Sequence, residues 1–136
     1  MIVDRNGLEV LEETECFRLL SHATVGRIGL SMGALPVILP VNFLVDDRRI
    51  LIRTGSGTKL DAALHDAVVA FEVDHIDPFE HGGWSVCVTG VAREVHDRDD
   101  LARIAALPLA HWTPNGLGHV MEVSTDLVSG RRIVRP

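Results

Sequence analysis

The stretch ILIRTGSGTKLDAAL, residues 50–64, leads from an apolar strand through a short turn with two glycines into a helix. Gly55 and Gly57 let backbone N–H groups approach a ligand closely. The helix that follows adds the positive end of its dipole, which favours an anion. Two cations and three hydroxyls complete the segment: Arg53, Lys59, Thr54, Ser56 and Thr58. These groups suit a phosphate monoester, although the same residues also suit an ordinary strand–turn–helix junction.

The spacing of the glycines excludes one common phosphate loop. Only one residue separates Gly55 from Gly57, and Lys59 follows two positions later. The GxxxxGK[ST] spacing of nucleoside triphosphatases is therefore absent. The sequence gives little support to nucleoside triphosphate hydrolysis.

Length and composition set the class of protein. A chain of 136 residues fits a single domain, residues 1–136, with a core of its own. No apolar run approaches the length of a bilayer span, and the first ten residues lack the basic start of a signal peptide. The formal net charge of −6, without a basic run, argues against a nucleic-acid partner. We therefore expect a cytoplasmic protein with no membrane or nucleic-acid partner, whose Cys16 and Cys87 are reduced core thiols.

Hydrophobic spacing predicts a mostly β protein with a few short helices. Helical spacing covers residues 9–20, 59–65 and 99–107, and β-prone runs cover 24–32, 34–46, 48–54, 67–77, 84–97 and part of 120–136. Turn residues at 32–34 and 46–48 predict that the first three runs form an antiparallel meander. Pro36 and Pro40 cannot donate ladder hydrogen bonds, so this stretch should lie at an edge, a bulge or a barrel corner, where the sheet bends. The pattern favours a closed or partly closed antiparallel barrel with helices at its ends.

Two of these runs are apolar at almost every position. Residues 68–73 and 86–88 contain few polar side chains. Such runs indicate strands that are buried on both faces over part of their length. We expect one face to pack in the barrel and the other to contact a partner.

Six sequence blocks follow one another along the chain: GRIGLS (26–31), LPVNF (39–43), IRTGSGTKL (52–60), AFEVD (70–74), GWSVCVTGVA (83–92) and SGRRI (129–133). This succession resembles the flavin-binding split-barrel proteins related to pyridoxamine 5′-phosphate oxidase. Within them it is similar to the small bacterial branch that includes nitroimidazole-resistance reductases. The resemblance covers about residues 14–134.

The resemblance implies a homodimer of split antiparallel β-barrels, with FMN held in two clefts between the subunits. Residues that match the family's phosphate-binding segment are Arg53, Thr54, Ser56, Lys59 and Leu60. Val41 and Asn42 match positions that face the flavin ring. Trp84, Ser85 and Val86 match a strand that is reached from the neighbouring subunit. The implied activity is transfer of a hydride or electrons from reduced FMN to a small planar acceptor, for which no side chain need act as a nucleophile.

Alternatives to this function remain open. Pyridoxamine phosphate oxidation needs further basic residues, and the sequence offers only Arg131 and Arg132, which an exposed strand edge would also explain. A related branch uses a deazaflavin coenzyme, whose acidic tail would favour extra cations at the cleft, with Arg27, Arg48 and Arg49 as candidates. The chain could also be a non-catalytic flavin carrier, or a barrel that has lost its cofactor.

The histidines do not suggest a metal site. The seven histidines of the chain show no HxxxH or paired Cys–His spacing. His111 and His119 flank Trp112. If this connection lies over the cleft, a histidine there can deliver a proton, but a structural or solvated role is favoured for both. No catalytic residue and no metal ligand is therefore assigned.

Overall fold

The computed structural model describes residues 1–109 and 118–134. Its strands and helices, in chain order, are β1 (Ile2–Val3), β2 (Leu8–Val10), α1 (Glu13–Ser21), β3 (Val25–Met32), β4 (Leu35–Asn42), β5 (Leu44–Asp46), β6 (Arg49–Gly55), α2 (Lys59–Leu64), β7 (Val68–Asp77), β8 (Gly82–Glu94), α3 (Arg98–Ala105), β9 (Gly118–Val123) and β10 (Leu127–Ile133). The expected class, a mostly β chain with short flanking helices, is confirmed.

The strand pairs within the described residues are all antiparallel, and β8 joins the two parts of the sheet. One path of paired strands runs β1-β2-β10-β8-β7-β3-β4, while β6 pairs with β5 and β9. The end of β8 pairs with β9, since Ala92 lies opposite Val123 and Glu94 opposite Met121. A strand of 13 residues can serve both parts because its two ends pair with different neighbours.

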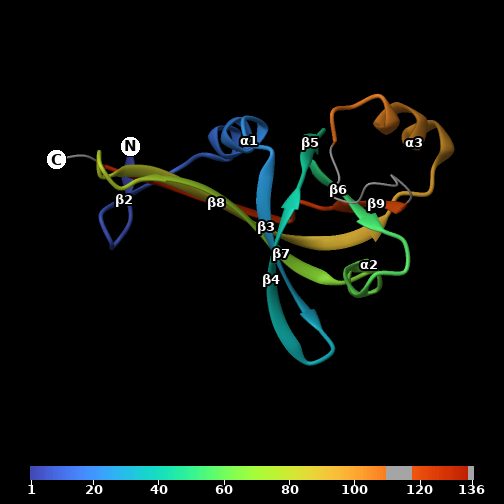
Figure 1. The fold of residues 1–136 in the computed structure, drawn as a ribbon. Helices are drawn as coiled ribbons and strands as arrows, with labels where there is room; N and C mark the ends of the chain where they lie inside the picture. The colour runs from blue at the N-terminus through green and yellow to red at the C-terminus, as the bar shows by residue number, and fades with distance from the viewer. Residues whose placement is uncertain (110–117, 135–136) are drawn as a thin grey trace.

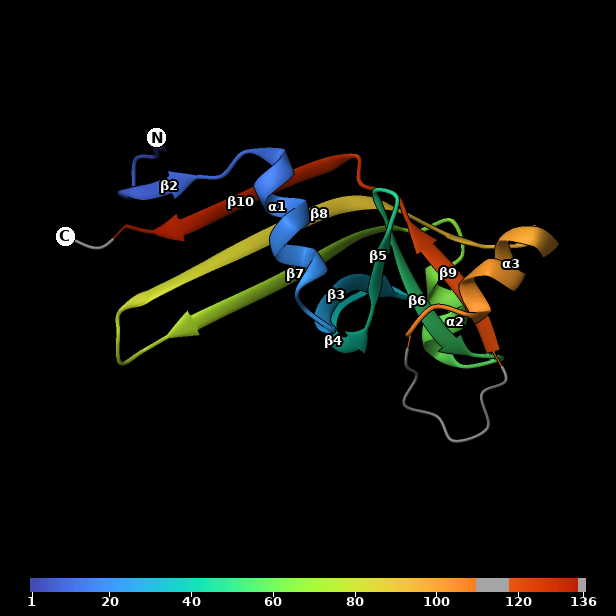
Figure 2. The ribbon, with the colours of Figure 1, turned by 90° about the horizontal axis from the view of Figure 1, so that it is seen from above.

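The molecule is elongated rather than compact. Figure 2 shows the β7–β8 hairpin, with β10 and β2 beside it, extending away from the end that holds α2, α3, β6 and β9. In Figure 1 the β3–β4 hairpin projects from the middle of the molecule, and α1 lies over the opposite side. The long hairpin therefore places part of β8 far from the glycine-rich turn that follows β6.

The main core fills the space between the curved sheet, α1 and α2. Phe71 is fully buried there, and its ring meets the ring of Phe43 edge to face at 4.8 Å. A smaller core lies under α3 and consists of Leu51, Val95, Ile104, Leu109 and Val120. β4 ends the path of paired strands, so of the three positions that its prolines allowed, the structure shows the edge.

Two expectations about the first half of the chain are wrong. Residues 8–10 form β2 rather than the start of a helix, and the Leu11 N–H donates to the Gly130 carbonyl, so α1 begins only at Glu13. The run 34–46 is not one strand either. It breaks at Phe43, whose N–H donates to the Thr24 carbonyl. β4 therefore pairs with β3, and β5 with β6, which makes two hairpins in place of a meander.

The expected burial of β7 and β8 on both faces is not found in the single chain. Burial alternates along β7, where Val69 and Phe71 are buried while Val68 and Ala70 are exposed. Cys87 of β8 is exposed as well, whereas Cys16 is buried, so the prediction of two core thiols holds for Cys16 alone. Within the described residues, only one face of β7 is therefore covered over residues 68–73.

No helix within residues 1–109 and 118–134 is long and apolar enough to cross a membrane.

Candidate functional site

The glycine-rich turn after β6 is held in one conformation by its own hydrogen bonds. Gly57 has a φ of 78°, which favours glycine. Thr58 is the N-cap of α2: its hydroxyl donates to the Gly55 carbonyl at 2.8 Å and accepts from the Asp61 N–H at 3.1 Å. The helix that follows has only six residues. The turn is thus ordered mainly by its cap, and an anion there would be bound by side chains and loop amides.

Asp61 lies beneath this turn and was not identified from the sequence. Its carboxylate accepts hydrogen bonds from the Thr54 hydroxyl at 2.7 Å, the Gly57 N–H at 3.4 Å and His119 Nδ1 at 2.8 Å. Burial acts to raise the pKa of Asp61, but the hydrogen bonds from Thr54, His119 and Gly57 outweigh it and lower that pKa. The carboxylate therefore stays ionised under the turn. The Thr58-x-x-Asp61 spacing of an N-cap was the one local signal for it.

The predicted phosphate-binding residues do not all face the same side. Thr54 is buried, and its hydroxyl is directed at Asp61. Arg53, the preceding strand residue, donates from Nε to the Leu109 carbonyl at 3.1 Å. Ser56 and Lys59 are exposed. Ser56 and Lys59 are therefore the two that solvent reaches most freely, while Thr54 holds the turn to Asp61.

An apolar cavity lies beside Lys59. It has a volume of about 600 Å³ and is lined by α2 and the β3–β4 hairpin, through Met32, Gly33, Leu35, Val37, Lys59, Ala62 and Ala63. Lys59 makes no ion pair with any residue in the described part of the chain. The cavity thus combines an apolar surface with an ammonium group that has no ion-pair partner among the described residues. Such a combination suits an anion that also has an apolar part.

The residues predicted to face the flavin ring lie on β4. Val41 is buried, and Asn42, the last residue of β4, is half-buried. They pair with Gly26 and Val25 of β3. Leu60 packs against the main core from α2. Of these three, Asn42 has a polar side chain that remains partly accessible.

Trp84, Ser85 and Val86 lie on the long hairpin rather than near the turn. In β8 they pair with residues 73–75 of β7 and 130–132 of β10. Val86 is buried, and Trp84 and Ser85 are half-buried. Because this hairpin extends away from α2 (Figure 2), the single chain does not bring these three residues together with Lys59.

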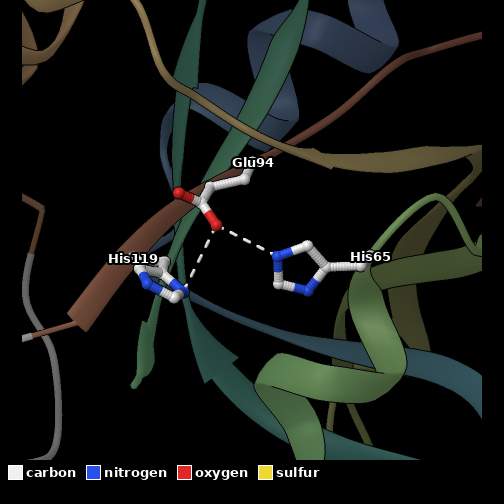
Figure 3. Close-up of side chains that lie close together, drawn as sticks. All are labelled: His65, Glu94 and His119. Atoms are coloured by element: carbon white, nitrogen blue, oxygen red, sulfur yellow. Dashed lines mark hydrogen bonds and ion pairs between the residues drawn. The ribbon is translucent and has the colours of Figure 1, made fainter. Parts of the chain in front are cut away.

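A second group that the sequence analysis did not recognise lies between α2, β8 and β9. His65, Glu94 and His119 point toward one another (Figure 3), and a ligand atom of each lies within 4.8 Å of the others. The expectation that the histidines do not gather is wrong for His65 and His119. They are 54 positions apart in the sequence and meet because β9 pairs with both β6 and β8.

The comparison with known proteins identifies the family. The family model described as pyridoxamine 5′-phosphate oxidase matches residues 12–132, which is most of the chain. The chain belongs to this family. The resemblance that the six sequence blocks indicated is confirmed.

Family members similar to this chain include two mycobacterial proteins. An uncharacterized protein of Mycobacterium tuberculosis is 40% identical over 129 residues, covering 91% of this chain and 84% of that protein. The solved structure of an FAD binding protein from Mycobacterium smegmatis is 39% identical, covers 93% of this chain and 98% of the other, and superposes with a TM-score of 0.79. The split-barrel fold is therefore that of a flavin-binding relative.

A more distant structure shows the same fold. A candidate 5-nitroimidazole antibiotic resistance protein from Bacteroides thetaiotaomicron is 13% identical, covers 92% of this chain and 87% of the other, and has a TM-score of 0.70. At this level of identity the match concerns the fold alone.

In this chain, the two arginines near the C-terminus are held by acidic side chains. Arg131 donates to Asp4 at 2.9 Å, and Arg132 donates to Glu15 at 2.7 Å. β10 lies between β2 and β8, so the expected strand edge is absent at this place. Both arginines tie β10 to the N-terminal part of the chain.

The cations considered for a deazaflavin tail are also paired, and with different elements. Arg27 lies within 3.7 Å of Glu72 and 3.6 Å of Asp74. Arg48 pairs with Glu13 and lies over the Phe17 ring. Arg49 bonds with Asp46, Asp100 and Glu122. These three arginines form no common cationic patch in the described structure. His111 and Trp112 lie outside the described residues.

The outer face of β3, β4 and β7 carries an unusual carboxylate. Glu72 lies in a depression that Arg27, Gly29, Ile38, Ala70 and Asp74 also line. Its Oε1 is buried and has no hydrogen-bond partner among the described residues. Burial, followed by the nearby Asp74, raises the pKa of Glu72 to about 7, while Arg27 acts in the opposite direction. Cys87, opposite Glu72 in the sheet, faces the same side.

This carboxylate makes a pH dependence of stability expected. The pKa of Glu72 is higher in the folded chain than its ordinary value of 4.5. Its contribution to stability is therefore full below about pH 4.5 and is lost as the pH rises through about 7. Urea unfolding at pH 5 and pH 8 should show that Glu72→Gln removes part of the loss of stability seen in the parent. An equal loss in both proteins would contradict the raised pKa.

Proposed function

We propose that this chain binds a phosphate-bearing flavin, FMN, in a cleft between two copies, and acts as a reductase on a small planar acceptor. The observation that carries the proposal is Lys59, which makes no ion pair with the residues that the structure describes and lies at the edge of an apolar cavity of about 600 Å³. FMN has the matching chemistry, with an apolar ring system and an anionic tail. The resemblance to a relative described as FAD binding, 39% identical, supports a flavin as the ligand.

The residues present fit this ligand. Lys59 and the exposed Ser56 would hold the phosphate, with loop amides as further donors. Asp61, already ionised under the turn, fixes the loop through Thr54 and Gly57. The half-buried amide of Asn42 would orient the ring. When bound, the cofactor supplies hydride-transfer chemistry; the chain supplies binding, orientation and exclusion of water.

A homodimer is proposed because one chain separates the parts of the site. Lys59 and Trp84 lie on different ends of the molecule, so a cleft that contains both needs a second copy. The outward face of the sheet also carries large apolar side chains that are 71% exposed at Ile38, 71% at Val68 and 68% at Leu127. Obligate interfaces of roughly 2,000 Å² or more are rich in such groups. Light scattering that shows a folded monomer with full flavin affinity would contradict the shared cleft.

The decisive experiment compares FMN with riboflavin in the parent and in Lys59→Ala. In the parent, riboflavin should bind at least about tenfold more weakly than FMN, because one charged hydrogen bond contributes roughly 1.5–3 kcal/mol. Lys59→Ala should weaken FMN binding by roughly 10- to 100-fold and leave riboflavin affinity nearly unchanged. Quenching of flavin fluorescence measures all four affinities.

The controls separate the phosphate site from the fold. Arg98→Ala removes one exposed cation at the start of α3 and should leave FMN affinity unchanged. Melting curves of the proteins without flavin should coincide, since Lys59 is exposed. Equal FMN affinity in the parent and in Lys59→Ala would place the phosphate elsewhere and reduce the turn to a strand–helix junction. Titration with FAD in the same assay determines which flavin is preferred.

Turnover then separates a reductase from a carrier. With reduced nicotinamide as donor and a panel of planar acceptors, a reductase should consume the donor in a flavin-dependent way. Tight flavin binding without acceptor reduction would indicate a carrier. A colourless protein that gains no flavin on titration would indicate a barrel without this cofactor, and reduction supported by a deazaflavin alone would indicate that coenzyme.

A further inference from the structure

Three side chains from separate elements meet at one point on the surface beside α2. His65 is the residue that follows α2, Glu94 is the last residue of β8, and His119 is the second residue of β9. Figure 3 shows the two imidazole rings directed at the same carboxylate. Their backbones are fixed by the cap of α2 and by the β6–β9 and β8–β9 pairing. The group is therefore held by ordered elements rather than by a free loop.

The distances between the polar atoms are those of a small cation's ligands. His65 Nε2 lies 3.0 Å and His119 Nδ1 lies 3.4 Å from Glu94 Oε1. An ion with bonds of about 2.0–2.1 Å in tetrahedral geometry needs ligand atoms about 3.3 Å apart. Two edges of the tetrahedron are thus already close to the required length. The third distance, between the two imidazole nitrogens, is within 4.8 Å.

The hydrogen bond that His65 Nδ1 makes leaves the other ring nitrogen, Nε2, available to bind a metal ion. His65 Nδ1 lies 2.7 Å from the Asp61 carbonyl oxygen, so Nδ1 carries a proton and donates it. In the neutral ring, the lone pair is then on Nε2, which faces Glu94. A backbone carbonyl that fixes the tautomer in this way is the usual companion of a metal-binding histidine.

His119 supplies the second nitrogen. Its Nδ1 lies between Glu94 and Asp61, at 2.8 Å from Asp61 Oδ1. Binding of a cation requires this nitrogen to release its proton to solvent. Asp61 then keeps the hydrogen bonds from Thr54 and Gly57, so its carboxylate is not left unpaired.

Charge and exposure also suit a cation. Glu94 Oε1 lies near two imidazole nitrogens, His65 Nε2 at 3.0 Å and His119 Nδ1 at 3.4 Å. A divalent ion placed among these three atoms would be bound by one carboxylate oxygen and two imidazole nitrogens. The side chains of His65, Glu94 and His119 are 42%, 17% and 34% exposed, so an ion can enter from solvent and keep a water molecule as its fourth ligand.

We propose that His65, Glu94 and His119 form a binding site for one divalent transition-metal ion, with Zn²⁺ as the best match. Two imidazoles and one carboxylate are a common zinc ligand set. The ion would join the end of α2 to β8 and β9, and so fasten the helix that follows the glycine-rich turn. None of its three ligands is among the residues proposed to contact the flavin, so each ligand can be replaced without removing a proposed flavin contact.

The test uses the full chain without an affinity tag, after removal of metal with a chelator. Calorimetric titration with Zn²⁺ should give one ion per chain, and the melting temperature should rise with Zn²⁺ concentration. Co²⁺ should give the visible absorption bands of a four-coordinate ion. His65→Gln and His119→Asn should each weaken Zn²⁺ binding by at least about tenfold. His22→Gln, an exposed histidine at the end of α1, is the matched control and should bind Zn²⁺ as the parent does.

Several results would overturn the proposal. Zn²⁺ affinity that is the same in His65→Gln and the parent, or binding without a defined stoichiometry, would show that the three residues are only an ion-paired network. Circular dichroism of each variant establishes that it is folded. If a histidine variant does not fold, the Zn²⁺ titration is made with Glu94→Gln, which preserves the size of the side chain and should also weaken Zn²⁺ binding. Flavin titration with and without Zn²⁺ keeps the two proposals apart, because failure of one leaves the other measurable.

Discussion

Replacing Phe71 by alanine is expected to lower the free energy of unfolding by about 3–5 kcal/mol. Phe71 is fully buried at the centre of the main core and meets Phe43 edge to face. Its ring also covers Gly26, where no side chain would fit beside it. Truncation removes this apolar contact and leaves a cavity that β3 and β7, paired directly at this place, cannot close.

The matched control is Phe79→Ala. Phe79 lies in the β7–β8 turn and is 92% exposed, so its replacement should change stability by less than about 0.5 kcal/mol. Urea unfolding followed by circular dichroism, at one fixed protein concentration, measures both variants. Equal losses for the two phenylalanines would mean that the core is not centred on Phe71.

Replacing Arg49 by alanine is expected to cost about 2–3 kcal/mol, the second-largest effect. Arg49 is only 20% exposed and contacts Asp46 at 2.9 Å, Asp100 at 2.7 Å and Glu122 at 2.7 Å. It thus joins β5, β6, α3 and β9. Its removal leaves three carboxylates close together without their shared cation.

Arg103→Ala is the control, since Arg103 contacts Asp46 and Asp100 from the outside and is 50% exposed. Its loss should cost less than about 1 kcal/mol. Arg49→Lys should recover only part of the stability, because one ammonium group cannot bind three carboxylates in the geometry of a guanidinium. Thermal and urea unfolding at pH 7 give the comparison. A larger loss for Arg103→Ala than for Arg49→Ala would contradict the central place of Arg49.

Lowering the pH should reduce the difference in the free energy of unfolding between Arg49→Ala and the parent. The hydrogen bond from Arg103, and then that from Arg49, lower the pKa of Asp46 to about 2 against the effect of burial. A lowered carboxyl pKa stabilises the fold above the ordinary value of 3.8, and this stabilisation is lost as the pH falls toward 2. The same unfolding experiment at pH 2.5 to 7 tests this.

The elements that the sequence predicted well depend on neighbouring residues. The hairpin turns at 32–34 and 46–48, α2 after Thr58, and the edge position of the proline-containing β4 all follow from local backbone preferences. The errors at residues 8–10 and at Phe43 have one cause. In both places a hydrogen bond to a distant segment, Gly130 or Thr24, overrides the local pattern.

The same distinction applies to the candidate site, where some features follow from adjacent residues and others from the pairing of distant strands. The sequence by itself determined the antiparallel β class, the glycine-rich turn with Lys59, and the family, because strand period, turn chemistry and residue order are properties of adjacent positions. Only the tertiary structure decided that Thr54 faces Asp61, that Cys87 is exposed, and that His65 and His119 share Glu94. These facts depend on which strands pair and in which register. Pairing brings together side chains that are far apart in the sequence, and no local spacing encodes it.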